Sequence, residues 1–206
     1  MKREAKRVFF SRVDDNYRQL LIAASNSPHL KRISSVTNTV DLQSISFDIL
    51  NDLLPKKTFQ VIADSTGRKL EHTMVSINEG RELVGKAFKT PMNSNEVKVY
   101  HLEYSFDTTG EKSCLDNTVK YNSRELPISF ISNKLLMHYY FQGEPEDVAQ
   151  DIQREKNQVV ELINTNQKEV DDFFTSKRDS FLAHIRLAAN DRLLEMKKLD
   201  DDTSLF

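Results

Sequence analysis

The sequence is poor in the residues that build disulfide frameworks, thiolate metal cages and phosphate-binding loops. Cys114 is the only cysteine among 206 residues, so no disulfide can form within the chain, as expected for a protein kept in a reducing cytoplasm. Five glycines leave little material for a phosphate-cradling loop, and no such loop, Gly-x-Ser-x-Gly elbow or kinase signature occurs. We therefore expect a non-catalytic protein in which Cys114 is an incidental thiol.

Long apolar runs and an excess of one charge are also missing. The opening segment "MKREAKRVFFSRVDD" returns to charge within a few residues, and no later run approaches the roughly 18 apolar residues of a membrane span. We therefore expect a cytoplasmic protein without membrane contact. With 29 basic and 31 acidic residues the formal net charge is -2, which supplies no overall field for holding a polyanion.

Nucleic acid would therefore need a local basic patch. The candidate contacts near the start of the chain are Lys2, Arg3, Lys6 and Arg7. Two further basic pairs lie in loops, at Lys31 and Arg32 and at Lys56 and Lys57. Aromatic side chains interleave only loosely with these clusters, so solvated faces are the favoured interpretation, and a nucleic-acid-binding subunit is the alternative function.

Hydrophobic spacing predicts helices in the first quarter of the chain. Residues 3–27 carry apolar side chains at mostly helical intervals and end in a Ser-Asn-Ser-Pro breaker. With the polar connection that follows, they make up an N-terminal part, residues 1–40. A second helix is predicted next, with Asp41 as its expected cap and Pro55 as its stop.

From Pro55 to Phe141 the apolar period changes to two, which is typical of strands. The segments "TFQVIA" and "HTMVSI" flank the turn signal Ser65-Thr66-Gly67, and "PISFI" and "KLLMHYYF" flank Ser132-Asn133, which predicts two hairpins. Between them "EVKVYHLEYSF" alternates over its whole length. Because polar loops separate these runs, we expect residues 41–143 to combine one helix with an antiparallel sheet.

The most regular feature is an apolar stripe that repeats every eleven residues after the helix start at Gly143-Glu144-Pro145. Its members are Val148, Ile152, Val159, Ile163, Val170, Phe174, Phe181 and Ile185. Eleven residues in three turns keep the stripe on one side of a continuous helix. Such a helix over 145–187 would measure roughly 65 Å, longer than a compact chain of this size is wide. The alternative is a hairpin near Asn164-Thr165-Asn166.

A stripe of this size must face the sheet, a partner helix or both, because burying it stabilises the fold. We predict that it mediates self-association or docks an effector, so the expected partner is a second copy or a helix-binding protein. Residues 144–199 are assigned to this helical, coiled-coil-like segment. Residues 200–206 are assigned to a mobile acidic tail.

The triplet Glu96-Val97-Lys98 matches the acid-x-lysine pattern of restriction-type nucleases, in which two carboxylates hold a metal ion and the lysine orients the attacking group. Asp64 is the conceivable second carboxylate. Because Glu96 lies at the mouth of a predicted strand, where water would compete for the metal, a solvated strand end is the favoured interpretation. A small metal-dependent hydrolase built on Asp64, Glu96 and Lys98 is the third hypothesis.

Five histidines are scattered along the chain without the close spacing of a zinc site, so we expect no metal ion and no cofactor. His101 and Glu103 fall on one face of a predicted strand and could form a hydrogen bond. We interpret them as a structural pair.

Five segments, taken in order, carry a resemblance to a known group. They are "DLQSISFDILNDLLPKKTFQV", "VKVYHLEYSFDTTGEKSCL", "ISFISNKLLMHYYF", "IQREKNQVVELI" and "KRDSFLAHIRLAAND". In order and pattern the chain resembles the N-terminal accessory region of poorly characterised bacterial proteins that carry a C-terminal restriction-endonuclease-like (PD-(D/E)xK) nuclease domain. No catalytic motif lies in the matching segments, and none of them corresponds to that nuclease domain. The resemblance therefore implies an accessory role beside a nuclease, associated with antiviral defence.

Together these patterns predict an α+β protein, with an antiparallel β-rich body between N-terminal helices and a long C-terminal helix or helical hairpin. The expected function is that of a non-catalytic sensor, adaptor or specificity subunit acting by protein-protein interaction. The resemblance implies bacterial antiviral defence as its setting, with a nuclease or other effector as its partner and a phage protein as the candidate trigger.

Overall fold

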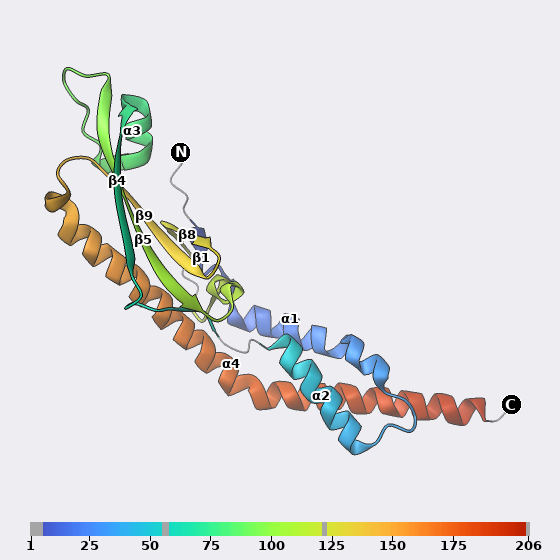
Figure 1. The fold of residues 1–206 in the computed structure, drawn as a ribbon. Coiled ribbons are helices and arrows are strands. Elements are labelled where there is room, and N and C mark those ends of the chain that lie inside the picture. The colour runs from blue at the N-terminus through green and yellow to red at the C-terminus, as the bar shows by residue number, and fades with distance from the viewer. Residues whose placement is uncertain (1–5, 55–57, 121–122, 205–206) are drawn as a thin grey trace.

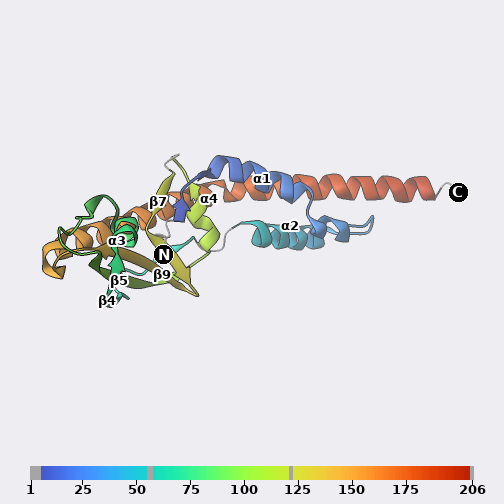
Figure 2. The same cartoon turned by 90° about the horizontal axis from the view of Figure 1, so that it is seen from above.

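A single helix, α4 (Pro145–Thr203), runs along the whole molecule (Figure 1 and Figure 2). In the computed structural model, which describes residues 6–54, 58–120 and 123–204, this helix has 59 residues and so measures about 90 Å at about 1.5 Å per residue. Pro145 occupies the first turn, where its missing N–H costs nothing. The predicted continuous helix is confirmed, and the alternative of a hairpin is wrong. Of the helices in the described ranges, none is long and apolar enough to cross a lipid bilayer.

A curved antiparallel sheet forms the body of the molecule (Figure 1). Its longest strand, β5 (Glu96–Thr109), pairs with β9 (Lys134–Phe141), which pairs in turn with β8 (Ile128–Ile131). Ser132 takes the left-handed conformation, with φ 51°, in the turn between β8 and β9. The hairpin predicted there and the α+β class are therefore confirmed.

The other edge of β5 carries two strands in succession, β3 (Gln60–Val61) and β4 (Gly67–Ser76). Both pair with β5, so the hairpin predicted between them is wrong. The residues that join them bulge outward, and Asp107 donates its backbone N–H to the hydroxyl of Ser65 in this bulge (2.9 Å). The turn-forming residues thus make an irregularity in one edge rather than a chain reversal.

A short helix, α3 (Ile77–Val84), interrupts the predicted run of strands between β4 and β5, and a 3-10 turn, Gly85–Ala87, follows it. The Ser76 hydroxyl caps the helix by accepting a hydrogen bond from Glu79 N (3.3 Å). Gly85 ends it with φ 71°, a conformation that glycine adopts without strain. The spacing Ser-x-x-Glu is a helix-start signal that sequence reasoning missed here.

Alternation along β5 sends its side chains into two different clusters. On one face the sheet packs against the first half of α4, through Tyr100, Leu102, Tyr104 and Phe106 of β5 and Leu135, Met137 and Tyr139 of β9. On the other face Val97 and Val99 pack under α3. By the same alternation His101 and Glu103 follow on that second face, where they are half-buried.

Helices α1 (Val13–Ser25) and α2 (Thr39–Leu53) pack against the second half of α4 and form a helical arm (Figure 1). Between them lies a 3-10 helix, Pro28–Arg32. The cap of α2 is Asn38, which accepts a hydrogen bond from the backbone N–H of Asp41 (2.9 Å), so the cap predicted at Asp41 is wrong by one turn. The end of α2 before Pro55 agrees with the prediction, although Pro55 itself lies outside the described residues.

Of the described residues in the predicted N-terminal helix, Val13–Ser25 are helical, whereas strands lie between Lys6 and Arg12. Here β1 (Lys6–Val8) pairs antiparallel with β7 (Arg124–Leu126), and β2 (Ser11–Arg12) pairs parallel with β6 (Asn117–Thr118). A 3-10 helix, Lys112–Asp116, precedes β6, and Phe9 donates its backbone N–H to Leu115 O (3.0 Å). Val8 and Phe9 enter the core of the body, which explains why these apolar residues do not belong to α1.

The other end of the chain differs from prediction as well. The expected acidic tail begins at residue 200, but Asp200, Asp201 and Asp202 continue α4. Residues 205–206 lie outside the described ranges.

Where α4 passes from the body to the arm, three polar side chains bind the backbone of the body. Asn164 accepts a hydrogen bond from Val61 N (2.9 Å) and donates one to Val61 O (3.0 Å). Asn166 donates to Asn117 O (2.8 Å), and the buried Gln167 donates to Cys114 O (2.9 Å). Asn164 and Asn166, which suggested a break in the helix, therefore anchor it to the body together with Gln167.

Replacing Asn164 with leucine is expected to lower the free energy of unfolding by about 1 to 3 kcal/mol, because the backbone groups of Val61 lose their partners at a half-buried site. Urea titration followed by circular dichroism measures the change. Asn157→Leu is the matched control, because Asn157 is exposed on the same helix, and its effect should stay within about 0.5 kcal/mol. Equal effects of the two substitutions would contradict the anchoring role of Asn164.

Candidate functional site

The apolar stripe of α4 is a core face rather than a free surface. Seven of its members are buried, and Val148 is half-buried. Its first part packs on the sheet, and its second part packs on α1 and α2. The following residues were predicted to contact a partner, and this prediction is corrected because the chain itself covers them: Val148, Ile152, Val159, Ile163, Val170, Phe174, Phe181 and Ile185.

The three residues of the hydrolase hypothesis do not come together. Glu96 pairs with Ser76 at the start of β5, whereas Asp64 lies in the bulge beside the far end of that strand. About ten strand residues at about 3.3 Å each place them roughly 35 Å apart. Lys98 is occupied locally, with its Nζ 4.5 Å from the centre of the Tyr100 ring. The fold therefore rules out a shared metal site for Asp64, Glu96 and Lys98.

The described part of the basic cluster is engaged with the body. Lys6 Nζ lies 4.8 Å from the centre of the Phe130 ring. Arg7 Nε donates a hydrogen bond to Ser123 Oγ (2.7 Å). Lys6 thus contacts β8 of the sheet, and Arg7 contacts the residue that precedes β7. Lys2 and Arg3 lie outside the described residues, as do Lys56 and Lys57.

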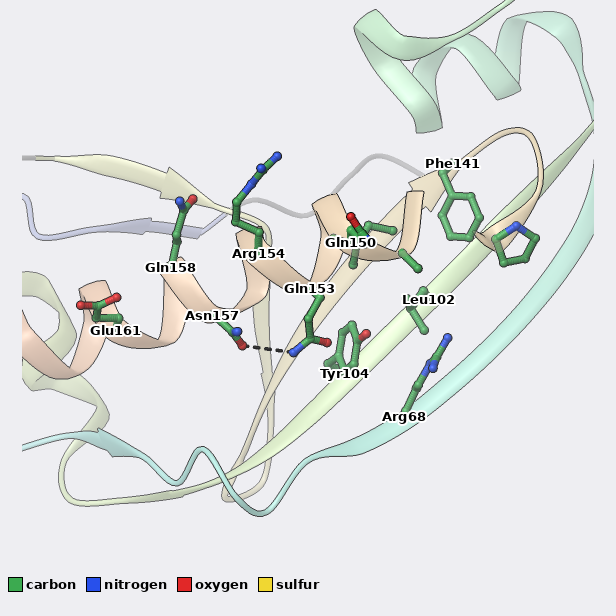
Figure 3. Close-up of a pocket in the computed structure, with 13 residues that line it drawn as sticks. Arg68, Leu102, Tyr104, Phe141, Gln150, Gln153, Arg154, Asn157, Gln158 and Glu161 are labelled. Carbon is green, nitrogen blue, oxygen red and sulfur yellow. Dashed lines mark hydrogen bonds between the residues drawn. The ribbon is translucent and has the colours of Figure 1, made fainter. Parts of the chain in front are cut away.

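A groove of about 640 Å³ opens between the first turns of α4 and the sheet (Figure 3). Leu102 and Tyr104 of β5 form its floor, and Arg68 of β4 lies across from the helix. The wall on α4 carries the amide side chains Gln150, Gln153, Asn157 and Gln158 together with the charged side chains of Arg154 and Glu161. Because amides both donate and accept hydrogen bonds, this wall can bind a polypeptide backbone.

Beside this groove lies β4, the edge strand of the sheet. Nine of its ten residues are exposed, and among the described strands only β5 pairs with it. Leu70 and Met74 are 40% and 55% exposed on this strand. Lys69 and Glu71 form an ion pair on this strand (2.7 Å). The hydrogen bond between them raises the pKa of Lys69 and lowers the pKa of Glu71, so both side chains are charged at neutral pH. An unpaired edge of this length is a ready template for another strand.

On the sheet face opposite α4, β5 and β9 bring together a polar cluster in which sequence reasoning found His101 and Glu103 but missed His138. His101 Nε2 lies 3.1 Å from His138 Nδ1, which lies 3.6 Å from a carboxylate oxygen of Glu103. His138 Nε2 lies 2.9 Å from Ser129 Oγ on β8. We call His101, Glu103 and His138 the histidine cluster. His101 bonds to His138 rather than to Glu103, which corrects the predicted pair.

The residues of the histidine cluster are half-buried, and neighbouring charges shift the pKa of His101 in opposite directions. The Tyr140 ring stacks on His101, with centres 4.5 Å apart and planes 7° apart. Burial lowers the pKa of His101, the charge of His138 lowers it further, and Glu103 and Glu71 oppose that shift. The neutral form of His101 is therefore favoured. Among the described residues this cluster is a group whose donor atoms, all within 4.8 Å of one another, could hold a metal ion.

Cys114 is buried beneath the N-terminal strand, with 1% of its surface exposed. Burial raises the pKa of its thiol from 9.0 to about 11, and the nearby carboxylate of Glu111 adds to the shift. The thiol is therefore protonated at neutral pH and takes no part in nucleophilic chemistry.

Comparisons with known proteins add no functional assignment. No protein-family model matches the chain, and neither a curated protein nor a solved structure matches it. The groove, the β4 edge and the histidine cluster are therefore the features of the molecule that bear on its function.

Replacing Phe181 with alanine is expected to lower the free energy of unfolding by about 3 to 5 kcal/mol, because the ring is fully buried in the arm. Urea titration measures the change. Leu187→Ala on the same helix is the matched control, because Leu187 is 63% exposed, and its effect should stay within about 0.5 kcal/mol. A Phe181 variant that keeps its stability but changes its solution mass would restore the docking prediction.

The Cys114 thiol is expected to resist alkylation of the native protein at pH 8 and to react fully in denaturant, because burial holds its pKa near about 11. Mass spectrometry after timed exposure to iodoacetamide measures the extent of reaction. The denatured protein is the control for reagent activity. Rapid modification of the native chain would show that the thiol is accessible.

Proposed function

We propose that the protein is a non-catalytic cytoplasmic adaptor that acts by protein-protein contact and dimerises along the free edge of β4. The observation that carries this proposal is the exposure of nine of the ten β4 residues, on a strand that pairs only with β5 among the described strands. A second copy would extend the sheet by main-chain hydrogen bonds. The amide-lined groove beside β4 would widen the contact.

The charges on β4 favour one register for this pairing. Charged residues on an edge strand normally discourage indiscriminate pairing. In an antiparallel pair centred on Leu70, however, Leu70 faces its own copy and Lys69 faces Glu71 of the second copy, twice by symmetry. Each such cross-strand pair contributes roughly 0.2 to 1 kcal/mol. Lys69 and Glu71 therefore discourage pairing with other strands and favour pairing with a second copy of β4.

The architecture of α4 suits an adaptor. One helix contributes to the core of the body and to the core of the arm, so it holds the β4 edge at a fixed distance from the arm (Figure 1). The arm presents apolar side chains seven residues apart, at Val40 and Phe47 of α2 and at Leu187 and Leu194 of α4. Residues at this spacing lie on one side of a helix, so they offer the arm as the effector contact.

A nuclease or other effector of bacterial antiviral defence is the partner class we propose for the arm. Its support is the order of the five segments that resemble the accessory region of nuclease-bearing bacterial proteins.

The solution mass tests the dimer directly. Light scattering across a tenfold concentration range should show twice the chain mass of 23.8 kDa at the upper end. Lys69→Glu should weaken the dimer about tenfold or more, because two attractive pairs become repulsive. The double variant Lys69→Glu with Glu71→Lys should restore the dimer, because it exchanges the two charges.

Lys197→Glu is the matched control, because Lys197 is exposed on α4 in the arm and its charge reversal leaves β4 unchanged. Circular dichroism of each variant checks that the fold is intact, as expected for substitutions at exposed positions. A monomer throughout the concentration range, or a dimer that is indifferent to Lys69→Glu, would contradict pairing along β4.

A further inference from the structure

The atoms of the histidine cluster have the spacing of a metal-ligand set. Four ligands about 2.1 Å from a zinc ion in a tetrahedron lie about 3.4 Å from one another. His101 Nε2 and His138 Nδ1 are 3.1 Å apart, and His138 Nδ1 and Glu103 Oε2 are 3.6 Å apart. All three donor atoms lie within 4.8 Å of one another, so small rotations of the side chains would let one ion contact them.

The surroundings of the cluster orient its donor atoms. Ser129 Oγ, 2.9 Å from His138 Nε2, can accept that N–H and so leaves the Nδ1 lone pair free to face His101 and Glu103. Stacking on Tyr140 holds the plane of the His101 ring.

The three residues lie on β5 and β9, the two inner strands of the sheet. His101 and Glu103 are two residues apart on β5, and Glu103 stands directly opposite His138 of β9 in the strand register. Strand pairing thus sets the separation of the ligands before any ion arrives. The side chains of Glu103 and His138 are 29% and 19% exposed, so the site is sheltered and still open to exchange with solvent.

We propose that His101, Glu103 and His138 bind one divalent transition-metal ion, of which zinc best suits two imidazoles and one carboxylate. Three protein ligands leave a fourth position for water or for an incoming ligand. A cavity of about 530 Å³ adjoins His101 on this side, and its other lining residues are Glu71, His72, Thr73, Glu79, Leu83 and Tyr140. The bound ion would link β5 to β9 through side chains, in addition to their main-chain hydrogen bonds.

Zinc chloride added to the tag-free, chelator-treated full chain tests the site by isothermal titration calorimetry. One ion per chain is expected. His101→Gln and His138→Gln should each weaken binding by about 10- to 100-fold, and Glu103→Gln by about tenfold. His29→Gln is the matched control, because His29 also pairs with a carboxylate, that of Asp52 (2.7 Å), but lies in the arm. That variant should bind zinc as the unchanged chain does.

Nitrogen NMR of the unchanged chain tests the metal site without any substitution, so it does not depend on whether a variant folds. Zinc should shift the resonances of His101 Nε2 and His138 Nδ1 and leave those of His29 and His184 in place. Absence of saturable binding, or binding that the double variant His101→Gln with His138→Gln retains, would overturn the proposal. The cluster would then be a hydrogen-bonded network only. This outcome is distinct from failure of the β4 dimer, because the two tests use different residues and readouts.

Discussion

The apolar side of α4 is buried twice, first against the sheet and then against α1 and α2, and both cores depend on that burial. Eleven residues in three turns keep the stripe on one side of the helix, so the same helix can serve both cores without a break. Each fully buried valine, isoleucine or phenylalanine contributes roughly 1.5 to 3 kcal/mol before entropy costs. Because both parts of the molecule share α4, the body and the arm form one continuous unit (Figure 2).

This arrangement decides which surfaces remain for other molecules. Since α4 covers one face of the sheet and α3 covers only one end of the other, the outer edge of β4 and the histidine cluster stay accessible. The first surface is a strand edge with complementary charges, which suits a second polypeptide. The second is a set of nitrogen and oxygen donors on paired strands, which suits a metal ion. The proposed dimer edge and the proposed metal site are neighbours, because Lys69 and Glu71 of β4 stand opposite Glu103 and His101 of β5.

Sequence patterns of short range predicted much of the architecture. The start of α4 at Pro145, the hairpin at Ser132-Asn133 and the alternation of β5 follow from local conformational preferences and periodicity. Predictions were wrong where the same residue types are compatible with two local structures. Ser65-Thr66-Gly67 forms a bulge rather than a turn, and Asn164 anchors a helix rather than breaking it. In both places hydrogen bonds to residues distant in the sequence decided the outcome.

By itself the sequence determined the class of the fold and the apolar stripe, because periodicity expresses which side of each element avoids water. It left a continuous helix and a hairpin both open, and the structure decided for the helix. It did not determine what covers that stripe, since a core and an interface bury the same side chains. Nor could it place His138 beside His101 and Glu103, because His138 follows Glu103 by 35 positions in the sequence and only the pairing of β5 with β9 brings the atoms together. Tertiary structure decided these points through contacts between distant segments, which local spacing does not encode.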